Sequence, residues 1–162
     1  MGKMFATANT KISIGTAIDD QDDDFVAADF TSQTWTEIGG TTNLGQIGDA
    51  AELITSNQIA RGRTKKAKGT YNAGSMAIVC DLDPEDAGQT ALVAAGGNRS
   101  NFAFKIEFDD APAGGTPSTR YFIGLVMGTP EVFEDANSAK KLNATLEVNS
   151  NIVKVAAAEA TP

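Results

Sequence analysis

The sequence predicts a mainly β protein in which one short α-helix flanks a sheet. Segments that alternate apolar and polar residues recur along the chain, and this period of two is typical of half-buried strands. The clearest of them span residues 75–82, 102–108, 120–129 and 140–155. Only residues 83–95, between the first two, carry both a start and a stop signal for a helix. A lone helix among strands must pack on a sheet as a lid or flank.

The predicted helix has signals at both ends. Asp83 is expected to cap the free N–H groups, Pro84 suits the first helical position, and two acidic residues follow at the positive end of the dipole. Gly96-Gly97 should end the helix, since glycine takes the left-handed capping conformation without strain.

The strands around this helix differ in their two faces. Met76, Ile78 and Cys80 share one apolar face, as do the alternate aromatic and aliphatic residues of 102–108. Residues 120–129 are apolar on both faces, which predicts a strand buried on both sides. The last strand has an apolar face and a polar face, and the polar face consists of Asn143, Thr145, Glu147 and Asn149.

The first half of the chain has weaker patterns. Residues 11–17 alternate through Ile12 and Ile14 and predict a short strand, and segments 34–38 and 43–47 on either side of Gly39-Gly40 predict a hairpin. Asp19–Asp24 places five acids in six positions. A calcium loop would need fixed offsets and a central glycine, so we expect a solvated or partner-facing loop that includes Asp22, Asp23 and Asp24.

Residues 49–74 are expected to form a long, irregular loop, whose first half could be a strand or a loose helix. Its second half holds five of the 13 basic residues of the chain, Arg61, Arg63, Lys65, Lys66 and Lys68. Three interpretations remain open: a nucleic-acid patch, a solvated loop, or a surface that meets the acidic surface of another copy. A loop this long in a compact domain is usually functional or disordered.

Composition narrows the class of protein. A chain of 162 residues with 41% hydrophobic content suits one domain, which we place at residues 1–155 with an N-terminal arm at 1–9 and a flexible tail at 156–162. The net charge of −8 disfavours a protein that grips nucleic acid. No apolar run approaches the roughly 20 residues of a membrane span, so no membrane association is expected.

The residues that usually carry chemistry are scarce. Histidine is absent, and the single cysteine, Cys80, excludes an internal disulfide and is expected to be buried. No glycine-rich phosphate loop, CxxC, HExxH or GxSxG motif is present. Acid pairs such as Glu107 with Glu147 arise by chance, so we expect no enzyme, no cofactor and no metal site. With no secretory signal pattern at Met1–Phe5, folding in a reducing, intracellular compartment is expected.

The order of these segments resembles a known family. The stretches that carry the resemblance are 76–92, with Asp83-Pro84-Glu85 and Gly88-Gln89; 104–108; 122–126, with its central Gly124; and 139–148, leading to Val155. Together they resemble the tail tube (major tail) protein of lambda-like, long non-contractile-tailed bacteriophages, over residues 35–155. The first 30 residues match this family poorly.

The resemblance implies a β-sandwich or partial β-barrel with a flanking helix and a long stacking loop, here residues 49–74. It implies hexameric rings that stack into a tail tube, with the tape-measure, tail terminator and tail tip proteins as partners. Genomic DNA would pass through the lumen without specific binding. The protein would reside in the virion after assembly in the host cytoplasm. An additional immunoglobulin-like domain, which some relatives carry, is not expected.

Two sets of site residues follow from the resemblance. A lumen wall should be polar and not basic, since a basic wall would hold DNA by counterion release. The lumen candidates are Asn143, Thr145, Glu147 and Asn149, with Lys105 and Glu107 as neighbours. The inter-ring candidates are Arg61, Arg63, Lys65, Lys66, Lys68, Asp22, Asp23 and Asp24. The alternative hypothesis is a non-catalytic β-sandwich binding module that recognises a protein or a carbohydrate.

Overall fold

The computed structural model describes residues 2–161, so Met1 of the expected arm and Pro162 of the expected tail lie outside the described residues. The elements in chain order are β1 (Lys11–Ala17), the 3-10 helix η1 (Ala27–Phe30), β2 (Thr36–Glu37), β3 (Thr41–Asn43), β4 (Ala50–Ser56), β5 (Lys65–Asn72), β6 (Ser75–Asp81), α1 (Ala87–Gly96), β7 (Phe102–Glu107), β8 (Thr119–Gly128), β9 (Glu131–Val132), β10 (Lys141–Val148) and β11 (Val153–Val155).

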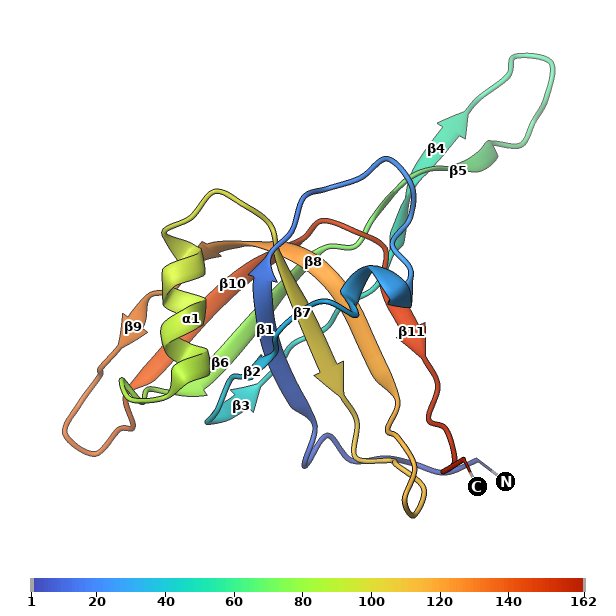
Figure 1. Ribbon diagram of the computed structural model, residues 1–162. Coiled ribbons are helices and arrows are strands. Elements are labelled where there is room, and N and C mark those ends of the chain that lie inside the picture. The colour runs from blue at the N-terminus through green and yellow to red at the C-terminus, as the bar shows by residue number, and fades with distance from the viewer. Residues whose placement is uncertain (1, 162) are drawn as a thin grey trace.

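Nine of the strands in the described residues form one antiparallel sheet (Figure 1). Its order is β2-β1-β7-β8-β10-β6-β3, with β11 paired to β8 and β9 paired to β10. The predicted mainly β fold with one flanking α-helix is therefore confirmed. The strands with the strongest alternation in the sequence, β7, β8, β10 and β6, occupy the centre of the sheet.

The two edges of this sheet are joined by a single short segment of chain. β2 pairs with β1 at one edge and β3 pairs with β6 at the other, although only residues 38–40 separate β2 from β3. The Ile38 N–H donates to the carbonyl of Ile12 (2.9 Å), and the Asp81 N–H donates to the carbonyl of Gly40 (2.8 Å). The sheet must therefore curl until its edges meet, and the chain changes partner at a bend, as in corners of orthogonal β-sandwiches.

The predicted hairpin at Gly39-Gly40 is wrong for this reason. The segments on either side of the two glycines pair with different strands and not with each other. Gly40 has φ +70°, and a Cβ there would approach the Asp81 carbonyl oxygen at 3.0 Å, so the bend requires glycine. The local sequence predicts a turn at the two glycines, but the tertiary pairing of the strands determines which segments this turn connects.

The helix α1 forms where the sequence predicts it, but its cap differs. Asp86 is the N-cap, and its carboxylate accepts from the backbone N–H of Gln89 (2.9 Å). The carboxylate of Asp83 instead accepts from the Glu85 N–H (3.0 Å), which closes a turn before the helix. The predicted start at Asp83-Pro84 is thus three residues early. The helix ends at Gly96, and Gly97 has φ −87°, so the predicted left-handed cap is wrong as well.

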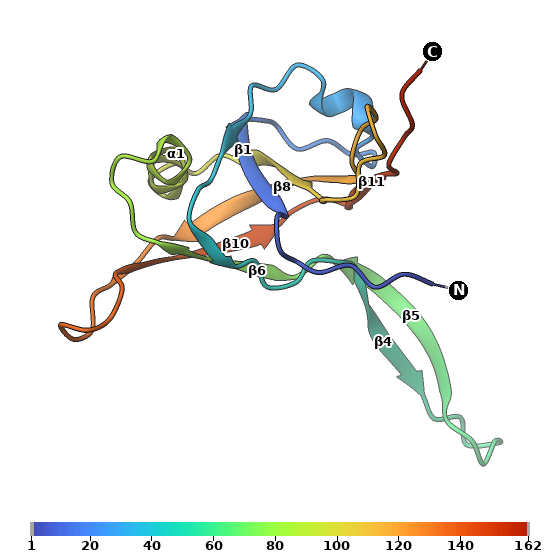
Figure 2. The same cartoon turned by 90° about the horizontal axis from the view of Figure 1, so that it is seen from below.

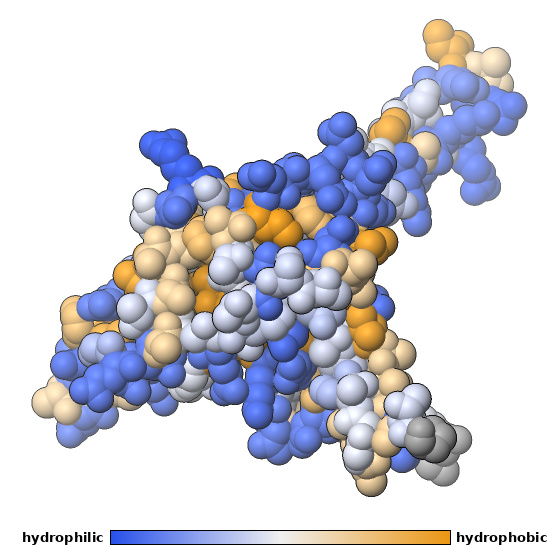
Figure 3. All heavy atoms as spheres, in the orientation of Figure 1, coloured by the Kyte–Doolittle hydropathy of each residue, from blue (hydrophilic) through white to orange (hydrophobic). Residues whose placement is uncertain are grey.

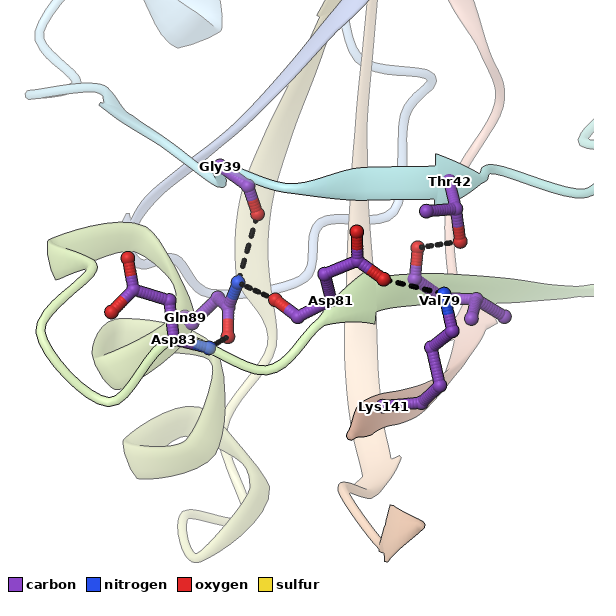
Figure 4. A network of polar contacts seen from close by, with 7 residues as sticks. All are labelled: Gly39, Thr42, Val79, Asp81, Asp83, Gln89 and Lys141. Atoms are coloured by element: carbon purple, nitrogen blue, oxygen red, sulfur yellow. Dashed lines mark hydrogen bonds and ion pairs between the residues drawn. The ribbon is translucent and has the colours of Figure 1, made fainter. Parts of the chain in front are cut away.

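Gln89 connects the helix to the place where the sheet closes (Figure 4). Its side chain is 2% exposed. The amide Nε2 donates to the carbonyls of Gly39 and Asp81 (both 2.9 Å), and Oε1 accepts from the Asp83 N–H (3.0 Å). The Gly39 N–H donates to the carboxylate of Asp86 (3.1 Å). One amide therefore holds the bend, the end of β6 and the start of α1 together.

The inner face of the curled sheet encloses the main core. Most of its buried side chains come from β1, β6, β7, β8, β10 and α1, and the large ones include Ile12, Ile78, Leu92, Phe104, Phe122, Leu142 and Leu146. Cys80 belongs to this core, as predicted, and burial together with the nearby Asp86 and Asp81 raises the pKa of its thiol to about 11. The thiol is therefore protonated and unreactive at neutral pH.

A second core lies on the outer face of β7 and β8. Phe25 and Phe30, from the segment around η1, cover Ala103 and Ile123. The ring of Phe30 stacks on Tyr121 at 5.2 Å between centroids, and Trp35 lies 5.9 Å from the same ring. Phe122 and Ile123 are both fully buried, so the predicted burial on both faces holds at the centre of residues 120–129, but it is wrong at the end of the strand, where Met127 is 61% exposed. The 3-10 helix that provides the cover has no signal in the periodicity.

The segment predicted as a long, irregular loop is a two-stranded antiparallel arm. β4 and β5 pair with each other and with no strand of the main sheet, and they project from the body (Figure 2). Ile54 is opposite Ala67 and Ser56 is opposite Lys65, so residues 57–64 form the turn at the tip. Within residues 2–161, no helix is long and apolar enough to cross a membrane.

The network around Gln89 predicts a measurable stability effect. Gln89→Met keeps the size and helix propensity of the side chain but leaves the two carbonyls and the Asp83 N–H without their partner. A buried polar group that loses its hydrogen-bond partner costs about 1–3 kcal/mol. We therefore expect the free energy of unfolding in urea to fall by roughly 3 kcal/mol. Thr90→Ala, at the exposed neighbouring position, is the control and should change it by about 0.5 kcal/mol or less. Equal effects of the two variants would contradict this role of Gln89.

Candidate assembly surfaces

The basic residues of the arm are all available to a partner. Arg61 and Arg63 lie in the turn, and Lys65, Lys66 and Lys68 lie on β5; all five are exposed. The ion pairs among residues 2–161 are Lys11–Glu37, Lys105–Glu107 and Lys141–Asp81, so none involves the arm. The turn is nevertheless ordered, since the Arg61 N–H donates to the Gln58 carbonyl (3.1 Å) and the Thr64 hydroxyl donates to Asn57 Oδ1 (2.6 Å).

The arm also exposes apolar side chains. Leu53, Ile54 and Tyr71 are each more than half exposed, and Ile59 in the turn is fully exposed. A lone two-stranded ribbon is at best marginally stable in water. Exposed apolar residues on such a ribbon indicate that another surface covers the arm in the functional state.

The acidic run Asp19–Asp24 lies between β1 and η1, and its residues are exposed as predicted. Asp24 lines a hollow together with Asp49 and Glu52, at the base of the arm. The arm therefore has an acidic base and a basic tip. A contact between the tip of one copy and an acidic surface of another would be favourable over a Debye length of about 8 Å at physiological salt.

The predicted lumen residues of the last strand form one row on the outer face of β10. This row lies beside the outward residues of β6, because Asn143 is opposite Val79, Thr145 opposite Ala77 and Glu147 opposite Ser75. The Ser75 hydroxyl donates to the Glu147 carboxylate (2.6 Å). Asn149 follows the end of β10, and its amide donates to Asn101 Oδ1 (3.0 Å). Thr145 and Asn149 are exposed, and the other two are partly exposed.

Lys105 and Glu107 lie on the same outer face but apart from this row, because β8 separates β7 from β10. They form an ion pair with each other at 2.7 Å. The ammonium of Lys105 also lies 5.3 Å from the ring centroid of Trp35, and its side chain is only 16% exposed. The pair therefore adds no mobile positive charge to the surface beside the β10 row.

Sequence reasoning missed an apolar groove beside the N-terminal segment. The groove is bordered by residues 5–10, 44–47 and 106–110, and its apolar lining consists of Phe5, Leu44, Ile47, Met76, Ile106 and Phe108. Asp109 and Asp110 stand at its rim. The lining residues come from segments that are far apart in the sequence, so no local pattern could have revealed the groove.

Asp110 is held ionised by its partner across the β7–β8 loop. Its carboxylate accepts from the Ser118 hydroxyl (2.6 Å) and from the Ser118 backbone N–H (2.7 Å). These two hydrogen bonds lower the pKa of Asp110 from its ordinary value. Among residues 2–161, no group of three His, Cys, Asp or Glu side chains is placed to hold a metal ion.

Comparison with solved structures identifies the fold. A chain of the hybrid solid-state NMR and cryo-EM structure of the SPP1 tail tube matches with a TM-score of 0.70 and 14% identity, over 94% of this chain and 80% of that one. The protein described here therefore has the tail-tube fold. A chain of the anti-feeding prophage (AFP) baseplate also matches, with a TM-score of 0.70 and 10% identity over 96% of this chain and 98% of that one.

A third structure extends the similarity to contractile injection systems. A chain from the sheath/tube terminator structure of the extracellular contractile injection system PVC matches with a TM-score of 0.67 and 12% identity, over 96% of this chain and 99% of that one. No protein-family model matches the chain, and no curated protein matches its sequence. At identities this low, the comparisons establish the tail-tube fold, and the predicted resemblance is confirmed at that level.

The pKa of Asp110 gives a testable prediction about the groove rim. A carboxyl with a lowered folded pKa contributes stability above its unfolded pKa and loses it as pH falls through the folded pKa. Ser118→Ala removes one of the two hydrogen bonds, so the pKa of Asp110 should rise toward its ordinary value. Carboxyl ¹³C NMR titration measures this shift directly, by comparison of the Asp110 resonance in the variant and in the unchanged protein. An unchanged Asp110 titration in the variant would contradict the assignment.

Proposed function

We propose that this protein is a structural component of a phage tail, the subunit whose hexameric rings stack into the tail tube. The observation that carries the proposal is the tail-tube fold combined with an ordered arm whose apolar side chains are exposed and whose basic side chains form no ion pair within residues 2–161. A monomer would leave this arm unsupported, whereas a polymer would cover it. Nothing in this role requires catalysis, a cofactor or a metal.

In this proposal the arm forms the contact between neighbouring rings. Arg61, Arg63, Lys65, Lys66 and Lys68 face an acidic surface of a neighbouring subunit, and Asp22, Asp23 and Asp24 offer one such surface. The acidic excess of the chain elsewhere makes the arm the one strongly basic surface element, so its attraction to another copy would set the register between subunits.

The β10 row is proposed as the wall of the lumen. Asn143, Thr145, Glu147 and Asn149 form a polar and mildly acidic row with no lysine or arginine among them. DNA passes such a wall without counterion release, so it neither binds nor stalls. Lys105 and Glu107 remain candidates as neighbours of the wall, with their charges neutralising each other.

The remaining parts of the proposal follow from a tube. The tape-measure protein would occupy the lumen before DNA, and the tail terminator and tail tip proteins would contact the two ends. The protein would be located in the virion tail after assembly in the host cytoplasm. Genomic DNA would be ejected through the lumen without specific binding.

Electron microscopy of the purified protein at high concentration tests the function. We expect stacked rings or hollow tubes, because the arm gains a partner only by association. In a reconstruction of such tubes, the β10 row should face the lumen. Monomers at every concentration, with or without tail tip proteins as initiators, would contradict the proposal and favour a binding module. Tubes with the β10 row outside would contradict the lumen assignment alone.

Charge reversal on the arm tests the contact between rings. Replacing Arg61, Arg63, Lys65 and Lys66 together by Glu should abolish tubes and leave the melting temperature of the monomer unchanged, because these side chains contact nothing in the body. The control reverses four exposed basic residues outside the arm, Lys3, Arg99, Lys140 and Lys154, with the same change of net charge. Tubes from the arm variant, or their equal loss in the control, would contradict an inter-ring role for the arm.

A further inference from the structure

The most exposed apolar side chain of the described residues stands at the tip of the arm. Ile59 has a relative exposure of 106%, in the turn that is closed by the Arg61–Gln58 hydrogen bond. Figure 3 shows hydrophobic residues at the far end of an arm that is otherwise mostly hydrophilic. Arginines follow Ile59 at positions 61 and 63. The tip is therefore an apolar knob with positive charges beside it.

The groove beside the N-terminal segment has the complementary character. Its volume is about 290 Å³, comparable to that of about ten liquid waters, which is room for a branched aliphatic side chain. The apolar side chains named above line it, and at its rim the carboxylates of Asp109 and Asp110 supply negative charge. Asp109 is exposed and forms no ion pair within residues 2–161; its carboxylate accepts a hydrogen bond from the neutral side-chain amide of Asn9 (3.1 Å).

A chain cannot place its own arm tip in its own groove. In Figure 1 the arm leaves the body at the upper right, whereas β1 begins and β7 ends at the lower side, where the groove lies. The seven residues of β4 alone carry the turn about 20 Å from the base of the arm. A contact between knob and groove is therefore intermolecular. It joins two different surfaces, so it is heterologous and repeats from copy to copy.

We propose that the arm tip of one subunit docks in this groove of another, with Ile59 in the apolar groove and Arg61 and Arg63 against Asp109 and Asp110. This inference rests on the proposed tube function and specifies the site that receives the arm. The opposite charges select the arm tip as the occupant, because a second N-terminal segment would bring Lys3 but no comparable cluster. Apolar burial would supply the affinity and the charges the orientation.

The contact also accounts for where the two acidic surfaces lie. The acidic run at 19–24 lies close to the base of the arm, since Asp24 shares a hollow with Asp49 and Glu52. Asp109 and Asp110 follow β7 near the start of β1, whereas the acidic run follows the end of β1. Of the two acidic surfaces, the one at Asp109 and Asp110 borders this apolar groove, which is why we assign the arm tip to it.

Disulfide trapping in assembled material tests the contact. The full-length double variant Ile59→Cys with Gln46→Cys places one thiol on the knob and one at the groove, both at exposed positions. Cys80 stays inert because it is buried in the core. Mild oxidation should give a ladder of dimers, trimers and higher species on a non-reducing gel, whereas either single variant can give a dimer at most. The control pairs Ile59→Cys with Ala136→Cys, an equally exposed position in the β9–β10 loop.

The outcomes separate this inference from the proposed function. A ladder several-fold stronger with Gln46→Cys than with Ala136→Cys supports docking in the groove. Tubes in the microscope with equal or absent ladders would overturn the groove contact while the tube function stands. Absence of both tubes and ladders would overturn both. Melting curves of each variant confirm that the monomer is folded before trapping.

Discussion

The closure of the sheet at residues 38–40 is the constraint on which the rest of the body depends. Because β2 and β3 are neighbours in the chain and opposite edges of the sheet, the strands between them have to curve around a common interior. The buried amide of Gln89 satisfies the backbone groups that this bend would otherwise leave without partners. Gly88 makes the approach possible, since a Cβ there would lie 2.0 Å from the Glu37 carbonyl oxygen. The helix is thus less a cover over the sheet than the element that holds its edges together.

A closed body changes what the protein can use for association. Open sheet edges offer backbone groups to any other strand, and closure removes most of that unspecific attraction. Association then depends on side chains of particular surfaces, and here the arm concentrates them. In the proposed tube, the arm would gain apolar burial on meeting a partner, so folding of the body and docking of the arm would be separate steps. This separation would suit a subunit that is dispersed before assembly and forms a wall afterwards.

The distribution of charge serves the same separation. In the proposed tube, a net charge of −8 would keep copies apart at long range, and the basic arm would allow approach in one orientation. The contact would weaken with salt because the arm charges are exposed, whereas its apolar part would not. A mildly acidic β10 row would also leave DNA unbound. One acidic chain can therefore be both self-associating and indifferent to the nucleic acid that it would conduct.

Periodicity in the sequence was sufficient for the central strands, the position of the helix, and the burial of Cys80 and of Phe122 and Ile123 on the two faces of β8. These features depend on which side chains avoid water, and that preference is local in the chain. The polar row of β10 and the exposure of the basic cluster could be predicted for the same reason. The pairing of the strands could not be predicted, because Gly39-Gly40 suits a hairpin turn and a bend between two sheet edges equally well. The N-cap is Asp86 and not the predicted Asp83, because residues 83–85 form a turn in which the Asp83 N–H donates to the buried side chain of Gln89. The arm was expected to be irregular because its strands pair only with each other and bury no face, so no hydrophobic alternation marks them. The groove arises where three separate segments meet, which only the tertiary structure decides.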